Sequence, residues 1–260
     1  MMRQNFYKEF AFIYDKLMVD VDYEKWTSFI LKNIPKNSMK ILEAACGTGN
    51  ITYHLANEYL NITAFDISEE MLVKAYEKLR KYRNVNILNQ DMVKFKINQL
   101  FDGCICCCDG VNYLNENDLK LFFEKVFNHL RENGKFIFDI STEYKYNSMS
   151  ETYVYDEDDV FYVWENNLNK DANTMSMEIN FFVKDKDKYN RITEFQTHYI
   201  HKVINIEKML NDVGFTEIKV YDGYTDNLYN DTSIRATFVC KKGEVWKKDV
   251  THFLGGNNET

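Results

Sequence analysis

The chain has 260 residues, of which 45% are hydrophobic and 28% charged, so it carries ample material for a packed core. Its net charge of −8 does not favour nucleic acid as a partner, because phosphate binding calls for a basic face. No run approaches 18 apolar residues and residues 1–10 lack the apolar region of a secretory signal, so we expect a cytoplasmic protein with no membrane span.

The first half of the chain alternates helical patterns with short apolar runs. Apolar residues at helical spacing predict a helical segment over 5–33, which Pro35 closes. Five strands are expected at 39–45, 62–65, 85–88, 101–107 and 135–140. Between them, helices are predicted over 51–59, from the N-cap Ser68 to 79, and over 117–130. This alternation requires a mostly parallel sheet with helices on both faces.

The pattern changes after Ser141. Alternating, aromatic-rich runs predict antiparallel strands at 160–166, 174–183 and 191–201. A helix over 206–213 and two strands at 216–221 and 234–240 then restore the earlier pattern. We therefore predict a doubly wound, mostly parallel, seven-stranded α/β sheet with a small antiparallel β insertion. The expected domains are 1–140 with 202–245 for ligand binding under an N-terminal helical cover, 141–201 as a substrate cover, and 246–260 as a tail.

Polar residues and glycines gather where the first four strands end. Residues 43–49 follow the first strand, Asp66 the second, Asp91 the third and residues 108–113 the fourth. Ligands of open α/β sheets bind outside these carboxyl ends, near the point where the strand order reverses. The four strand ends are therefore predicted to form one binding site.

The residue types at these ends suit a nucleoside with a charged tail. Gly47 and Gly49 let the backbone approach a ligand closely, and the helix start behind them can bind a carboxylate. Asp66 has the length to accept hydrogen bonds from two ribose hydroxyls, and Asp91 can accept from an adenine amino group. Met92 and Ile67 are the expected apolar walls against the ring.

Four cysteines lie close together in the fourth strand, at 104, 106, 107 and 108. They have no C-x-x-C spacing, and a strand points Cys107 away from the other three. They cannot converge on one tetrahedral metal, so we predict small apolar core residues and no metal site.

The run 41–50, Ile-Leu-Glu-Ala-Ala-Cys-Gly-Thr-Gly-Asn, resembles the first motif of class I S-adenosylmethionine-dependent methyltransferases. Residues 64–68, 89–92 and 109–114 resemble the second, third and fourth motifs. The likeness covers roughly residues 5–242 and is strongest to bacterial amino-sugar and glycine-type N-methyltransferases. It implies S-adenosylmethionine as the cofactor, bound by Tyr14, Glu43, Ala45, Gly47, Gly49, Asp66, Ile67, Asp91, Met92, Cys108 and Asp109. Ala45 stands where many relatives have glycine.

The expected reaction is methyl transfer to a nitrogen or oxygen of a small polar metabolite, by in-line attack on the sulfonium methyl carbon. Tyr14, Asn112 and Tyr113 are the candidate catalytic residues, which would orient the acceptor. His198 and His201 are candidate bases. Their spacing of three puts them on opposite faces of a strand, so at most one is expected to reach the pocket.

Three other functions would use a fold of this kind. A nicotinamide dinucleotide enzyme needs Gly-x-Gly-x-x-Gly, and in that register the chain offers Ala45, Gly47 and Asn50. A methyltransferase-like fold could also serve as a binding or assembly module without catalysis. An RNA or protein substrate would keep the same cofactor site.

Overall fold

The computed structural model describes residues 13–18, 20–34, 40–157 and 159–244. Residues 5–12 and 19 of the predicted helical segment, Pro35 and the predicted tail lie outside these residues. The helices are α2 (Tyr23–Asn33), α3 (Asn50–Leu55), α4 (Glu69–Leu79), α5 (Glu116–His129), α6 (Glu143–Ser148) and α7 (Val203–Val213), with a 3-10 turn η1 (Gly110–Tyr113). No described helix is long and apolar enough to cross a membrane.

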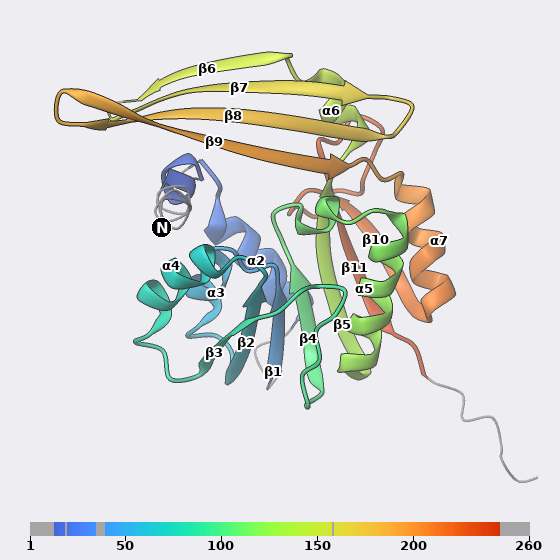
Figure 1. Ribbon diagram of the computed structural model, residues 1–260. Coiled ribbons are helices and arrows are strands. Elements are labelled where there is room, and N and C mark those ends of the chain that lie inside the picture. Colours follow the sequence, from blue (N-terminus) through green and yellow to red (C-terminus); the bar gives the residue numbers. More distant parts are fainter. Residues whose placement is uncertain (1–12, 19, 35–39, 158, 245–260) are drawn as a thin grey trace, which may run out of the picture.

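Two sheets form the frame of the molecule, and Figure 1 shows the smaller one lying across one end of the larger. The larger contains β1 (Lys40–Ala44), β2 (Asn61–Asp66), β3 (Val85–Asn89), β4 (Phe101–Cys106), β5 (Leu130–Ser141), β10 (Phe215–Asp222) and β11 (Arg235–Lys242). The smaller, called here the cover sheet, contains β6 (Thr152–Glu157), β7 (Val160–Asn169), β8 (Thr174–Asp185) and β9 (Lys188–Tyr199).

The strand order of the large sheet is β10-β11-β5-β4-β1-β2-β3. Strands β1 to β5 pair parallel with one another, and β11 pairs antiparallel with both β5 and β10. The chain moves outward from β1 to β3 and then returns to place β4 on the other side of β1. The reversal between β1 and β4 is where such sheets bind ligands. The predicted seven-stranded, mostly parallel fold is confirmed.

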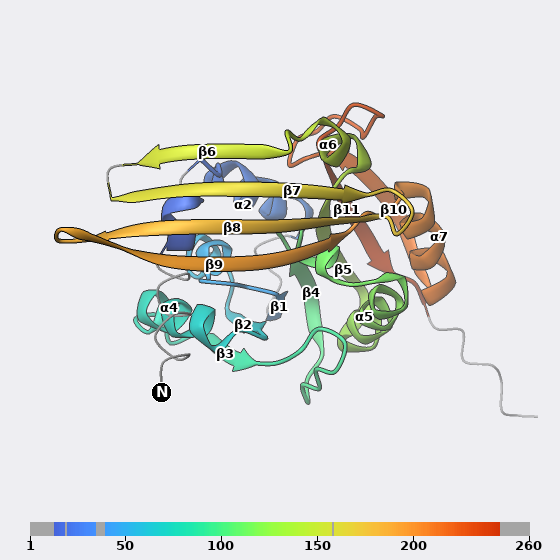
Figure 2. The same ribbon diagram turned by 45° about the horizontal axis from the view of Figure 1, so that its top comes forward.

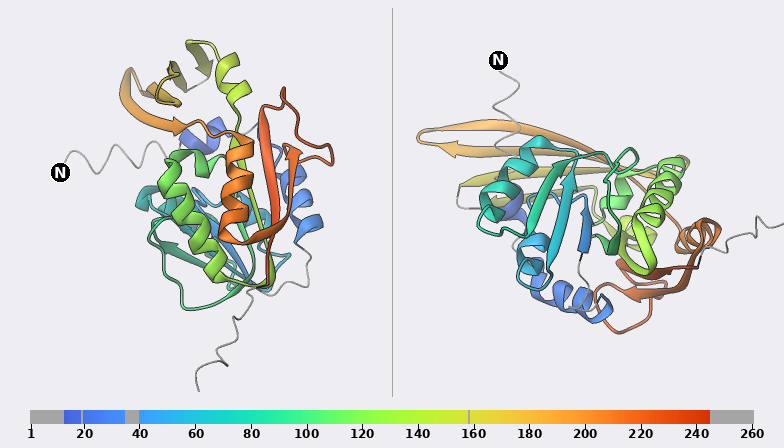
Figure 3. Two further views of the ribbon diagram at one scale, coloured as in Figure 1. Left: turned by 90° about the vertical axis from the view of Figure 1, so that its right-hand side faces the viewer. Right: turned by 90° about the horizontal axis from the view of Figure 1, so that it is seen from below.

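Successive residues of the central strands point into two opposite core layers. Cys104 and Phe136 pack with residues of α5 and α7, whereas Ile105 and Ile137 pack with residues of α2 and α3. All four side chains are fully buried. Cys104, Cys106 and Cys107 are buried as predicted, whereas Cys108 is only partly buried. Among the described residues, no three His, Cys, Asp or Glu side chains are grouped so that they could hold a metal ion. Figure 3 shows the helices on both faces of the sheet.

Several local signals act as the sequence predicts. The Ser68 hydroxyl caps α4 by accepting from the amide of Met71, and Gly214 ends α7 in the left-handed region at φ 112°. The fifth strand begins five residues earlier than predicted, at Leu130, because α5 passes into it without a loop. Helix α6 and strand β6 were not predicted.

The cover sheet is a four-stranded antiparallel meander in the order β6-β7-β8-β9. Its inner face packs Val160, Tyr162 and Phe181 against Ile13, which belongs to the helical residues 13–17. Figures 1 and 2 both place this short helical segment beneath the cover sheet. The segment therefore separates the cover sheet from one end of the α/β layers.

Candidate functional site

A cavity of about 490 Å³ lies between the carboxyl ends of the parallel strands and the inner face of β9. Its floor comes from residues after β1, β2, β3 and β4, and its roof from the cover sheet. The cavity brings together nine of the residues predicted from sequence: Tyr14, Glu43, Ala45, Gly47, Asp66, Ile67, Met92, Cys108 and Tyr113. Four other predicted residues, Gly49, Asp91, Asp109 and Asn112, do not line it.

The loop after β1 holds an acidic side chain in place. Asp66 accepts hydrogen bonds from the Gly47 amide at Oδ2 (2.8 Å) and from the Ser68 amide at Oδ1 (2.9 Å). Gly47 adopts φ 53°, a left-handed conformation that favours glycine. Ala45 adopts φ 53° as well, so the alanine at the usual glycine position keeps the left-handed turn at a cost of roughly 1 kcal/mol.

Glu43 is a buried carboxyl group at the end of β1. Its exposed fraction is 2%, and its Oε2 accepts a hydrogen bond of 2.6 Å from the Thr52 hydroxyl. Burial raises the pKa of Glu43 to about 7, and repulsion from Asp66 acts in the same direction. The cavity floor therefore contains a carboxyl group that ionises close to neutral pH.

Replacing Glu43 with glutamine should change how stability depends on pH. In the wild type the folded pKa of about 7 exceeds the ordinary value of 4.5, so the unfolded chain ionises first and stability falls as pH rises. Between pH 5 and 7 this loss amounts to about 2 kcal/mol. Glu43→Gln keeps the acceptor for Thr52 and removes the titration. Urea unfolding of the cofactor-free proteins should show that the free energy of unfolding of the variant, relative to the wild type, rises between pH 5 and 7. If the two proteins depend on pH in the same way, the raised pKa of Glu43 is contradicted.

Gly49 serves helix packing. It is the N-cap of α3 at φ 76°, and a Cβ there would lie 2.8 Å from Leu79 Cδ1 and 3.3 Å from Ala75 Cβ. Asp91 is engaged locally, since its carboxylate accepts from the Val93 amide (2.9 Å) and pairs with Lys94 (3.2 Å). The predicted adenine contact of Asp91 stays a prediction.

The helical residues 13–17 are tied to the loop after β1. Asp15 accepts hydrogen bonds from the Thr48 hydroxyl (2.5 Å) and the Asn50 amide (3.1 Å), and it pairs with Lys78 of α4 (3.2 Å). These contacts fix the neighbouring Tyr14 at the cavity, where burial raises its pKa. Asp15 thus positions its neighbour Tyr14 at the cavity.

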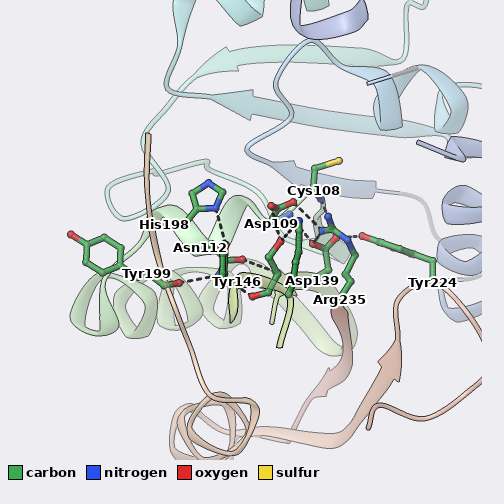
Figure 4. A network of polar contacts seen from close by, with 11 residues as sticks. Cys108, Asp109, Asn112, Asp139, Tyr146, His198, Tyr199, Tyr224 and Arg235 are labelled. Carbon is green, nitrogen blue, oxygen red and sulfur yellow. Dashed lines mark hydrogen bonds and ion pairs between the residues drawn. The ribbon is translucent and has the colours of Figure 1, made fainter. Parts of the chain in front are cut away.

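A buried ionic network supports the turn after β4 (Figure 4). Cys108 and Asp109 have φ values of 59° and 52°, and their amides donate to the Asp139 carboxylate at 3.0 and 2.7 Å. Arg235 bridges Asp139 and Asp109, at 3.0 Å from the latter, and Tyr224 donates its hydroxyl to Asp139. The strained turn that brings Cys108 to the cavity is therefore held by charge-assisted hydrogen bonds.

The same network engages the carboxylate of Asp109, whose predicted contact with the cofactor stays a prediction. Its carboxylate binds Arg235 and accepts from the Ser141 hydroxyl (3.0 Å), and the Arg235 guanidinium lowers its pKa against the effect of burial. Asp109 therefore contributes to the cavity through its backbone turn. No motif of the sequence revealed Arg235, which lies 126 residues further along the chain.

The side chain of Asn112 is engaged in hydrogen bonds within the protein. It is fully buried, its Oδ1 accepts from the Ser141 amide (2.9 Å), and its Nδ2 donates to the Tyr199 carbonyl (3.0 Å). The side chain thereby links η1 to β5 and to the end of β9. The predicted contact of Asn112 with an acceptor stays a prediction.

Tyr113 reaches the cavity and meets the cover sheet there. Its hydroxyl donates to Gln196 Oε1 of β9 (3.2 Å), and its ring lies edge-on to His198 with centroids 4.5 Å apart. His198 is buried, and burial lowers its pKa to about 4, so the imidazole is neutral at neutral pH. His201 lies beyond β9 and contacts the Leu114 carbonyl (2.9 Å). Neither histidine lines the cavity.

The roof contains residues that the sequence reasoning missed. Glu194 and Gln196 line the cavity from β9, and Tyr23 lines it from α2. Glu194 and Gln196 are two apart in a strand and so share one face. The sequence predicts that these two side chains share a face of the strand. It does not predict which face of β9 lies toward the α/β layers.

Comparisons with known proteins agree on one class. A family described as "Methyltransferase domain" matches residues 41–134. The chain is 32% identical over 242 residues to the Bacillus subtilis protein named "Putative methyltransferase YqeM". The aligned residues cover 92% of this chain and 98% of that protein.

Two solved structures extend the likeness to three dimensions. A Clostridium acetobutylicum S-adenosylmethionine-dependent methyltransferase is 39% identical, with a TM-score of 0.83 over 92% of this chain and 99% of that one. CalS10 of Micromonospora echinaspora, an amino pentose methyltransferase solved with S-adenosylmethionine bound, is 15% identical. Its TM-score is 0.71 over 88% of this chain and 96% of its own, which shows a shared fold.

Proposed function

Because the chain belongs to the class I S-adenosylmethionine-dependent methyltransferases, we propose that it methylates a nitrogen or oxygen atom of a small polar metabolite. The observation that carries this proposal is the cavity of about 490 Å³ roofed by the cover sheet. A roofed cleft of that size suits a cofactor with a small acceptor. An RNA or protein substrate would need a wider approach.

The floor of the cavity fits S-adenosylmethionine. The cofactor carries a sulfonium and an ammonium group, and the floor offers the carboxyl groups of Glu43 and Asp66. Each oxygen of Asp66 accepts one backbone hydrogen bond and keeps a lone pair for a ribose hydroxyl. A Cβ added to Gly47 would meet no atom within 4 Å, so this turn leaves room for a ligand against the backbone.

The chain's own residues then position the acceptor. The bound cofactor supplies a methyl group that is already activated for displacement, so the protein needs chiefly to align the nucleophile and exclude water. Tyr113 and Gln196 form a hydrogen-bonded pair at the junction of floor and roof, and Tyr14 approaches from the N-terminal side. These three groups are the proposed orienting residues.

The direct test is release of S-adenosylhomocysteine. The purified protein, supplied with S-adenosylmethionine and a panel of small amines and polyols, should release the product above the level measured without acceptor. Calorimetric titration with S-adenosylmethionine serves as the control for an intact site. Cofactor binding without product release from any acceptor would reject the proposal and favour a module that binds without catalysis.

A further inference from the structure

The roof of the cavity carries a carboxylate for which the proposed function has given no role. Glu194 lies on the inner face of β9, in the same row as Ile192 and Gln196. Its neighbour across the strand pair is Ile179, a buried aliphatic residue, and β9 is the edge of the cover sheet. Ile179 therefore offers Glu194 neither a charge nor a hydrogen-bond donor.

Among the described residues, Glu194 has no hydrogen bond or ion pair with another side chain. It is partly buried, burial raises its pKa, and its charge in turn raises the pKa of Tyr113. A carboxylate that faces a cavity without a partner carries a desolvation cost that a cationic ligand would offset. A carboxyl group whose pKa is shifted by burial and which lines a cleft is a candidate functional group.

The other charged groups on the cavity point to the same kind of ligand. Within the described lining, the charged side chains are Glu43, Asp66, Glu70 and Glu194, and no lysine, arginine or histidine is among them. Glu43 and Asp66 face the proposed cofactor from the floor. On the acceptor side of the cavity, an anionic acceptor would meet Glu194 and no lysine, arginine or histidine of the described lining, which opposes its entry.

We infer that Glu194 is a specificity-determining residue that selects acceptors bearing an ammonium group and rejects acceptors bearing phosphate or carboxylate near the reacting atom. The inference rests on the proposed function, since it concerns the acceptor of that same site. Gln196 and Tyr113 would hold the uncharged part of the acceptor beside Glu194. The acceptor is recognised as an ammonium ion and releases one proton to water, which frees the nitrogen lone pair. The lone pair would then form the new C–N bond as the bond between the sulfonium sulfur and the methyl carbon breaks, and S-adenosylhomocysteine would be the leaving group.

The test uses the full-length protein and matched probes that differ in one group. Glucosamine, glucose and glucosamine 6-phosphate form one set, and ethanolamine, ethylene glycol and phosphoethanolamine form a second. Wild type should methylate the amine of a set in preference to its hydroxyl and phosphate members. Glu194→Gln should raise KM for that amine about tenfold with kcat changed less, and should leave the Kd of S-adenosylmethionine within twofold.

The matched control is Glu165→Gln, which removes an exposed carboxylate from the outer face of the same cover sheet. It should leave both constants unchanged, and the melting temperatures of both variants report folding. Equal methylation of amine and hydroxyl probes, or a Glu194→Gln protein with unaltered KM, would overturn the inference. A fall in kcat at constant KM would also overturn it, because Glu194 would then act as a base.

Failure of the proposed function gives a different result. If no probe yields S-adenosylhomocysteine, binding of the same probes to the protein loaded with S-adenosylhomocysteine is measured by saturation-transfer NMR. A preference for amines that disappears in Glu194→Gln would support the inference even then. No preference for amines would reject it.

Discussion

Replacing Arg235 with methionine should lower the free energy of unfolding by about 3–5 kcal/mol. The change leaves the carboxylates of Asp109 and Asp139 facing each other in the interior with no guanidinium between them. Loss of one partner from a buried ionic network costs more than the network contributes, because the remaining charge stays desolvated. Urea unfolding at neutral pH, followed by circular dichroism, measures the effect.

Arg131→Met is the matched control. Arg131 pairs with Asp102 at 2.6 Å, but the two side chains are 44% and 21% exposed, so solvent screens the pair. An exposed pair of this kind contributes at most about 1 kcal/mol. Equal losses in the two variants would mean that burial of the Arg235 network has been given too much weight.

Asp66→Ala should weaken S-adenosylmethionine binding about hundredfold. The substitution removes the carboxylate proposed to accept two ribose hydroxyls, and each charge-assisted bond contributes roughly 1.5 kcal/mol. It also frees the amides of Gly47 and Ser68, which Asp66 holds in the absence of ligand. Isothermal titration calorimetry of the purified variant gives the change in Kd directly.

Glu69→Ala provides the comparison, since it removes an exposed carboxylate three residues further on, in the first turn of α4, and changes the net charge equally. Its affinity for the cofactor should stay within twofold of wild type. If Asp66→Ala binds as tightly as Glu69→Ala, the nucleoside does not lie against the end of β2.

The order of the elements in the large sheet was predictable because apolar periodicity and caps act locally. Ser68 and Gly214 mark helix ends through contacts within a few residues. Helix α6 escaped prediction because it has six residues and buries Tyr146 alone. Strand β6 pairs with one neighbour at the edge of the cover sheet, so its largely exposed residues lack the alternation of a half-buried strand.

The site was predictable only in part, for a related reason. Topology alone gathers the strand ends, which is why Asp66 and Gly47 lie together. Which side chain of a loop turns toward the ligand depends on partners far away in sequence. Arg235 engages Asp109 across 126 residues, and Asn112 is held by Tyr199 across 87. Such pairings have no signature in a single sequence, and neither does the choice of the face of β9 that carries Glu194.

The separation of floor and roof has a consequence for how this protein can diversify. The floor is encoded between residues 43 and 113, whereas the roof residues of β9 come from a stretch some eighty positions later, in a different sheet. We therefore expect substitutions on the inner face of β9 to change the accepted compound more than they change the turn between Ala45 and Gly49. The two halves of the site are joined mainly where Tyr113 meets Gln196 and where Asn112 meets Tyr199.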